Sequence, residues 1–246
     1  MIDTTRLELL LRTASDMGLK PEVVADRGLV SLEINSIPRY VFHKASNPND
    51  QMASWISGNK YATRVIMERS GLPNIPYCLP EDDLQAQKFL TLHRRIVAKP
   101  VRGQKSKDIH LITDIDHTKL AQLETGKYIL EKFVKGQEVR LLVVCGVVLA
   151  VHHKKYLTEI NNPNAVRRVS LEKSAWRKDL LPVAIAAAGA IGLRFSAVDF
   201  LVSDDGQHYV LEINSAPGID RFQQPDEGPA IDAMRLYLEQ LVKNYQ

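Results

Sequence analysis

Alternating apolar and polar side chains near the C-terminus predict a β-hairpin. Residues 195–203 and 207–214 each alternate in this way, and Asp205-Gly206 between them is a strong signal for a two-residue type I′ turn. Such a turn needs positive φ at both central positions. The register that follows from this turn pairs Ser203 with His208, Leu201 with Val210, Asp199 with Glu212, and Ala197 with Asn214.

This register gives the hairpin a polar and an apolar face, because successive side chains of a strand point to opposite sides. The polar face carries Asp199, Glu212 and Asn214. Directly opposed carboxylates repel, so a cation would stabilise them, and three oxygen donors suit Mg²⁺. The alternative is a solvated face whose acids point to water, and the register leaves both interpretations open. The apolar face carries Val198, Phe200, Val202, Tyr209, Leu211 and Ile213.

Apolar residues at helical spacing and short β-branched runs predict the other elements. The expected helices cover residues 5–17, 59–69, 81–92, 116–123, 182–191 and 229–245. The expected strands cover residues 23–24, 40–42, 76–79, 95–99, 109–112, 128–133, 138–144 and 147–153. Irregular segments are expected at residues 47–50 and 161–164, with Arg167 and Arg168 closing the second one. Helices and strands mix without strict βαβ alternation, which indicates an α+β fold.

The composition is that of an ordinary globular protein, with 246 residues, 45% hydrophobic and 25% charged. The net charge of +3 is too small to imply a nucleic-acid partner. No membrane partner is expected, because the longest near-apolar run, residues 180–193, is shorter than the ~18 residues that span a bilayer. The N-terminus does not look like a signal peptide, and the two cysteines make no disulfide framework. We therefore expect a cytoplasmic protein.

Four segments, taken in order, resemble motifs of the ATP-grasp superfamily. They are the helix GNKYATRVIMERSGLP, the strand RIVAKP, the strand LEKFVKGQEVRLLVV and the hairpin DFLVSDDGQHYVLEINSAPG. The segment before them is most similar to the ATP-grasp module of bifunctional glutathione synthetase and cyanophycin synthetase. The resemblance implies two α+β subdomains that close on MgATP. It divides the chain into a short N-terminal segment (1–57), a first subdomain (58–131) and a second subdomain with the hairpin (132–246).

The resemblance also implies an ATP site built from the first three of these segments. Lys60 and Lys99 are expected to reach the phosphates, and Glu131 to accept a hydrogen bond from the adenine amino group. Glu138 is expected to bind the ribose hydroxyls. The backbone that reads the edge of the adenine ring is expected at Lys132, Phe133 and Val134.

The remaining site residues follow from the same resemblance. Asp199, Glu212 and Asn214 are expected to hold Mg²⁺ against the phosphates, and Arg168 to contact the γ-phosphate and the acyl-phosphate. Residues 101–107 stand where the family has a glycine-rich loop over the phosphates, but they contain a single glycine. His152 to Lys155 receive no role.

The function that the resemblance implies is that of an ATP-dependent carboxylate–amine ligase. A carboxylate attacks the γ-phosphate to give an acyl-phosphate, which an amine captures, and ADP and phosphate are released. The expected cofactors are ATP and Mg²⁺, the expected substrates are small-molecule or peptide carboxylates and amines, and the family allows a homodimer. The glycine-poor loop keeps an alternative open, in which the chain is a non-catalytic or regulatory nucleotide-binding module.

Overall fold

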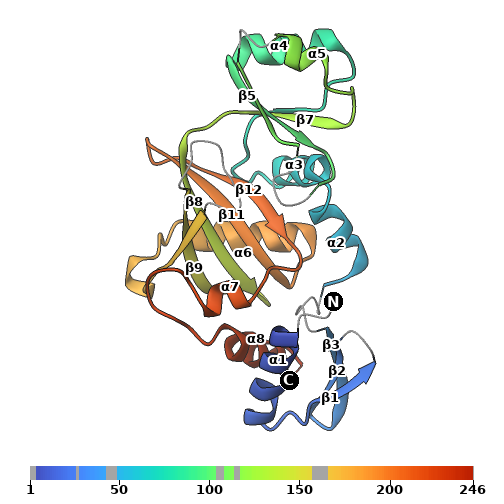
Figure 1. Cartoon of the computed structure of the whole chain (residues 1–246), viewed down its shortest axis with the longest axis vertical. Helices are drawn as coiled ribbons and strands as arrows, with labels where there is room; N and C mark the ends of the chain where they lie inside the picture. The colour runs from blue at the N-terminus through green and yellow to red at the C-terminus, as the bar shows by residue number, and fades with distance from the viewer. Residues whose placement is uncertain are drawn as a thin grey trace.

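A computed structural model describes residues 4–25, 28–42, 49–103, 108–113, 117–156 and 166–245. The described strands form three sheets, which follow one another along the long axis of the molecule (Figure 1). A three-stranded sheet lies at one end, a five-stranded sheet in the middle and a four-stranded sheet at the other end. Within the described ranges, no helix is long and apolar enough to cross a membrane.

The three-stranded sheet packs with the two terminal helices of the chain. Its strands are β1 (Glu22–Ala25), β2 (Leu29–Ile34) and β3 (Ile37–Phe42), and its helices are α1 (Thr4–Asp16) and α8 (Ala233–Asn244). Buried apolar side chains of β2, α1 and α8 share one core with the near ends of β8, β9 and β11. Helix α8 begins later than the predicted residue 229, because Asp232 caps it by accepting from the Arg235 N–H at 3.1 Å.

The four-stranded sheet has the order β4-β7-β5-β6 and carries two helices on one face. Its elements are β4 (Tyr77–Cys78), α4 (Asp83–His93), β5 (Arg95–Pro100), β6 (His110–Thr113), α5 (His117–Ala121) and β7 (Tyr128–Lys132). Ile96 and Ala98 point into the core beneath these helices. Because strand side chains alternate, Lys99 points to the opposite face, as does Glu131, whose register partner on β5 is Val97.

The five-stranded sheet has the order β10-β9-β8-β11-β12 and is covered by α6 on its apolar face. Its elements are β8 (Gly136–Val144), β9 (Val147–Tyr156), β10 (Val166–Ser170), α6 (Leu180–Ile191), β11 (Phe195–Ser203) and β12 (His208–Asn214). Arg167 and Arg168 were expected to close a loop, and that expectation is wrong, because both lie within β10 and pair with β9. The predicted loop at residues 161–164 lies outside the described residues.

The turn of the β11–β12 hairpin differs from the predicted type I′ geometry. Gly206 has a φ of 86°, but Asp205 does not adopt a positive φ. The carboxylate of Asp205 instead accepts from the Gln207 N–H at 3.1 Å, and the Ser203 N–H donates to the Gln207 carbonyl at 2.9 Å. The turn is therefore longer than two residues, so the predicted pairs of Ser203 with His208 and Leu201 with Val210 are wrong.

A β-bulge restores the predicted pairing at the end of the hairpin away from the turn, where Asp199 and Glu212 lie. The observed pairs are Val202–His208, Leu201–Tyr209, Phe200–Val210, Asp199–Glu212, Val198–Ile213 and Ala197–Asn214. Leu211 is the extra residue, and the one-residue shift turns the side chain of Val210 into the core. The predicted placement of Tyr209 and Leu211 on the apolar face is therefore wrong, whereas the opposition of Asp199 and Glu212 is confirmed.

Two helices link the sheets. Helix α2 (Gln51–Ser57) leads directly into α3 (Lys60–Arg69), which packs against α6 and β12. Asn59 caps α3, because its side chain accepts from the Ala62 N–H at 3.1 Å. The short elements η1 (Lys173–Ala175) and α7 (Asp220–Gln223) complete the described fold. The subdomain boundaries at residues 57 and 131 stay predictions.

Candidate active site

One face of the five-stranded sheet is polar, and the strand register arranges its side chains in rows. The first row crosses β12, β11, β8 and β9 through Glu212, Asp199, Arg140 and His152. The next row crosses β8, β9 and β10 through Glu138, Lys154 and Arg168. Residues two apart on a strand share a face, so the acids of the hairpin and the cations of β8 to β10 lie on one surface.

The carboxylate of Asp199 is buried and paired with two cations. Its oxygens accept from Nε and Nη2 of Arg140, both at 2.6 Å, and Oδ2 also accepts from Nζ of Lys154 at 2.7 Å. Burial alone would raise the pKa of the Asp199 carboxyl, but Arg140 and Lys154 outweigh that effect and lower the pKa to about 2. Asp199 is therefore ionised, and the bidentate pair fixes the orientation of its carboxylate.

The two other predicted metal ligands lie beside Asp199. Glu212 is exposed. In the amide orientation that satisfies both neighbours, Asn214 donates to Oε1 of Glu212 at 3.0 Å and accepts from Nη2 of Arg140 at 3.3 Å. Among the residues that the structure describes, no three His, Cys, Asp or Glu side chains cluster as a metal site. Mg²⁺ at phosphate sites takes one or two carboxylates and completes its shell with waters and phosphate oxygens. Two carboxylates and an amide oxygen therefore fit Mg²⁺ that is bound together with a nucleotide.

Glu138 is held on the same face by two neighbours from β9. Its Oε2 accepts from Nζ of Lys154 at 3.1 Å and from the hydroxyl of Tyr156 at 2.8 Å. Burial of the Tyr156 hydroxyl and its contact with Glu138 raise the pKa of Tyr156, so the hydroxyl stays protonated and donates. Lys154 thus bridges Glu138 and Asp199 and connects the two rows of the polar face.

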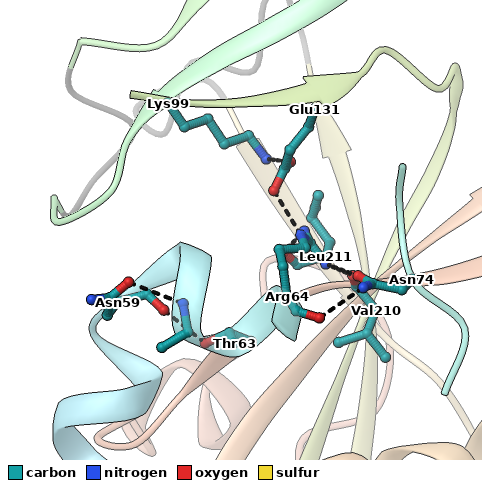
Figure 2. Close-up of polar contacts among 9 residues, drawn as sticks. Asn59, Thr63, Arg64, Asn74, Lys99, Glu131, Val210 and Leu211 are labelled. Carbon is teal, nitrogen blue, oxygen red and sulfur yellow. Dashed lines mark hydrogen bonds and ion pairs between the residues drawn. The ribbon is translucent and has the colours of Figure 1, made fainter. Parts of the chain in front are cut away.

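A second buried cluster joins α3 to the four-stranded sheet (Figure 2). Glu131 accepts from Nε of Arg64 at 2.7 Å and from Nζ of Lys99 at 2.6 Å, each with a different carboxylate oxygen. Burial would raise the pKa of the Glu131 carboxyl, but the two cations lower it to about 2. Arg64 also donates to the backbone carbonyls of Val210 and Leu211, which are freed at the bulge of β12. The cluster therefore ties both sheets together.

Lys60 lies between these two clusters. Burial lowers its pKa, Lys99 and Arg64 lower it further, and the negative charges of Glu212 and Glu131 oppose them. Its Nζ donates to the Gly103 carbonyl at 3.0 Å, at the start of the loop predicted to cover the phosphates. Residues 104–107 of that loop lie outside the described residues.

The backbone between the four- and five-stranded sheets passes through residues 133–135. The N–H of Lys132 donates to the Pro76 carbonyl at 2.9 Å, and that of Phe133 donates to the Arg95 carbonyl at 3.0 Å. The Phe133 ring packs against the guanidinium of Arg95, 4.2 Å from its centroid. Of the three residues predicted to read adenine, only Val134 has an N–H that no described residue accepts.

Arg168 lies toward the outer edge of the polar face. Its side chain is 20% exposed, and its Nη1 lies 3.8 Å from Oδ2 of Asp226. Burial and then the charge of Arg221 lower its pKa, Asp226 raises it, and Arg140 lowers it. His152 lies between Arg140 and Ser170, and burial followed by Arg140 and Arg168 lowers its pKa to about 4. The structure thus brings Arg168 to the face that carries Asp199.

The family model of the ATP-grasp domain matches residues 57–218, which is more than half of the chain. The chain belongs to the ATP-grasp family. The matched residues contain the backbone at residues 133–135, Lys60 and Lys99, and all the residues of the polar face. Solved structures share the fold: a bifunctional glutathione synthetase from Pasteurella multocida superposes with a TM-score of 0.75 at 14% identity, over 98% of this chain and 44% of that one.

Other relatives of this ATP-grasp chain are ligases. A tetrahydromethanopterin:α-L-glutamate ligase from Methanococcus maripaludis is 27% identical over 73% of this chain and 65% of its own length. A D-alanine–D-alanine ligase from Pelobacter propionicus is 30% identical over 68% of this chain and 59% of its own length. The ATP-grasp ligase PsnB, solved with a minimal precursor, Mg and ADP, has a TM-score of 0.66 at 18% identity over 80% of this chain and 62% of that one. The chain thus spans about three fifths of the length of the curated relatives it matches.

Three site residues were missed by the sequence analysis. Arg140 lies in a predicted strand, and Lys154 lies one residue beyond the predicted end of its strand at residue 153. The register that sets Arg140 opposite Asp199 and Lys154 opposite Glu138 was the available signal. Arg64 lies on a predicted helix, and nothing in the sequence of that helix indicated that its charge is buried. Arg64 pairs with Glu131, which lies on a distant strand. The periodicity of the helix does not show which distant residue its side chain will meet.

Proposed function

We propose that this ATP-grasp chain is an ATP-dependent ligase that joins a carboxylate to an amine and releases ADP and phosphate. One observation carries the proposal: Asp199, Glu212 and Asn214 lie on the same face as the cations Arg140 and Lys154. Phosphoryl transfer requires charge neutralisation and positioning more than covalent chemistry, and this face supplies both. The ligase relatives support this choice of reaction.

The metal site of the proposal uses the three oxygen donors of the hairpin. Asp199 and Glu212 supply negative charge, and Asn214 supplies a neutral oxygen beside them. These three residues would hold Mg²⁺, which would supply neutralisation of the charge that develops during phosphoryl transfer. Arg140 and Lys154 hold the Asp199 carboxylate in place, and each keeps further N–H donors that can contact a phosphate oxygen from the polar face.

The nucleotide site of the proposal follows the residues that converge between the two sheets. Lys99 and Lys60 bind phosphate oxygens, and Glu138, held by Lys154 and Tyr156, binds the ribose hydroxyls. The Val134 N–H donates to the adenine ring. Glu131 orients Lys99 through their 2.6 Å contact, and its carboxylate is the proposed acceptor for the adenine amino group.

The proposed reaction has two steps. A substrate carboxylate oxygen attacks the γ-phosphorus, the bond to the β-phosphate oxygen breaks, and ADP leaves. An amine then attacks the acyl carbon of the acyl-phosphate, phosphate leaves, and the amine proton passes to solvent. Arg168 stabilises the transferring phosphoryl group, and amino acids or short peptides are the substrate class that the relatives support.

A screen for ADP release tests this proposal. Purified protein with MgATP is incubated with amino acids and short peptides, singly and in pairs, and ADP is measured. We expect ADP release that depends on a carboxylate substrate and on Mg²⁺. If MgATP raises the melting temperature but no carboxylate stimulates ADP release, the chain is a nucleotide-binding module and the ligase proposal is wrong.

A further inference from the structure

A single side chain from the N-terminal segment completes the open end of the hairpin that carries the metal ligands. The β11–β12 ladder ends at the pair Ala197–Asn214, whereas β11 continues to Phe195 beside β8. Extending the register by two residues would place Ala216 opposite Phe195. The chain instead leaves the sheet after Asn214, so the Phe195 backbone would lack a partner on that side.

Asn49 occupies the place that Ala216 would take. Its Oδ1 accepts from the Phe195 N–H at 2.9 Å, and its Nδ2 donates to the Phe195 carbonyl at 2.6 Å. This exchange of two hydrogen bonds is the one that a residue of an antiparallel neighbouring strand makes. The amide of Asn49 therefore adds one hydrogen-bonded pair to the β12 side of the ladder, opposite Phe195.

The same amide also holds the chain as it leaves β12. Nδ2 of Asn49 donates to the carbonyl of Ser215 at 2.8 Å, and Oδ1 accepts from the Arg194 N–H at 2.8 Å. These four contacts use both donors of the amide and both lone pairs of its oxygen. Ser215 follows Asn214 directly, so the contact fixes the backbone next to a proposed metal ligand.

We propose that Asn49 is a positioning residue for the metal site. This inference rests on the proposed function, because the metal site is part of it. Asn49 sets the point at which β12 ends and thereby orients Asn214 toward Asp199 and Glu212. Partners that orient a metal ligand typically contribute 10–100-fold to metal affinity when they are removed. The adjacent Asp50 has a different role, since its carboxylate caps α2 by accepting from the Ala53 N–H at 2.6 Å.

The test measures how much Mg²⁺ strengthens ATP binding. For each protein, the dissociation constant for ATP is measured in EDTA and with Mg²⁺, and the ratio of the two is the metal contribution. Asn49→Ala removes all four contacts, and Asn49→Ser keeps a smaller donor and acceptor and disturbs the fold less. Asp50→Ala is the matched control, because it removes a helix cap from the same segment and leaves the hairpin contacts intact.

We expect the ratio to fall about 10-fold in Asn49→Ala, by less in Asn49→Ser, and not at all in Asp50→Ala. Affinity for ATP in EDTA should change by less than about 2-fold in all three. An unchanged ratio in both Asn49 variants, with melting temperatures lowered as in Asp50→Ala, would show a purely structural role and overturn the inference. An equal fall in Asp50→Ala would overturn it too. A ratio near 1 in the wild type would instead contradict the metal site of the proposed function, and with it the inference.

Discussion

Arg64 and Glu131 form an ion pair at 2.7 Å in which both side chains are only 2% exposed. Arg64 comes from α3 and Glu131 from β7, and the remaining guanidinium nitrogens reach Asn74 and the two carbonyls at the bulge of β12. The pair therefore fixes the four-stranded sheet against the hairpin that carries Asp199 (Figure 2). Since Glu131 also holds Lys99, the same contact positions a proposed phosphate ligand.

Glu131→Gln should destabilise the protein at neutral pH. Removing one partner of a buried pair typically costs about 3–5 kcal/mol, because the other charge is left without compensation. The pKa of Glu131 is lowered from 4.5 to about 2, so its contribution is fully present above about pH 4.5 and is lost as the pH falls toward 2. The difference in unfolding free energy between wild type and variant should therefore shrink over that range, measured by urea unfolding at several pH values.

Glu124→Gln is the control for this measurement. Glu124 pairs with Lys127 at 2.6 Å, but both side chains are about two thirds exposed, at 66% and 67%. Exposed pairs contribute at most about 1 kcal/mol, so this variant should stay close to wild type at every pH. A difference for Glu131→Gln that stays constant from pH 7 to pH 2 would contradict the assigned role of its charge.

Asp199→Asn and Glu212→Gln should behave differently without metal. Repulsion between opposed carboxylates would make both changes neutral or stabilising, but Asp199 is the shared partner of Arg140 and Lys154. Asp199→Asn should therefore lower the unfolding free energy by about 3 kcal/mol in EDTA. Glu212 is exposed, and its change should stay within about 0.5 kcal/mol.

With MgATP, both variants should lose the thermal stabilisation that the wild type gains. Each lacks one of the two anionic ligands of the proposed metal site. Melting curves of the three proteins in EDTA, and then in MgATP, separate the change in intrinsic stability from the loss of stabilisation by MgATP. If Glu212→Gln gains as much stability from MgATP as the wild type, Glu212 is not a metal ligand.

Arg168→Ala should slow phosphoryl transfer more than it weakens ATP binding. In the proposed function this guanidinium acts on the transferring phosphoryl group, so we expect a rate loss of about 100-fold with a change in ATP affinity below about 3-fold. Arg167→Ala is the matched control, because Arg167 points to the other side of β10, is 58% exposed and pairs with Glu227 at 3.2 Å. Equal losses in both variants would remove the catalytic role from Arg168.

The elements that the sequence predicted best are those with a local physical cause. The helices predicted over 59–69 and 182–191 end close to where they were expected, because Asn59 caps the start of α3 and Gly192 ends α6 with a positive φ of 87°. The opposition of Asp199 and Glu212 was also predicted, although through a turn geometry that the structure does not have. The longer turn and the bulge each shift the register by one residue, and the two shifts cancel.

The parts that the sequence did not predict depend on contacts between distant segments. Strand β10 is a short edge strand whose arginines lack the apolar alternation that signals a strand, and it is stabilised by pairing with β9. Arg64 is polar in sequence yet 2% exposed, because Glu131 and two backbone carbonyls satisfy it. Asn49 belongs to a predicted turn, and its partners lie about 150 residues further along the chain.

Trapping the acyl-phosphate with hydroxylamine tests the proposed reaction most directly. The protein is incubated with MgATP, hydroxylamine and a carboxylate that stimulates ADP release, with no amine substrate present. We predict a hydroxamate of that carboxylate and one ADP released for each hydroxamate formed, because the carboxylate must be phosphorylated before any nucleophile can attack its carbon. Release of AMP and pyrophosphate in place of ADP and phosphate would contradict the acyl-phosphate mechanism.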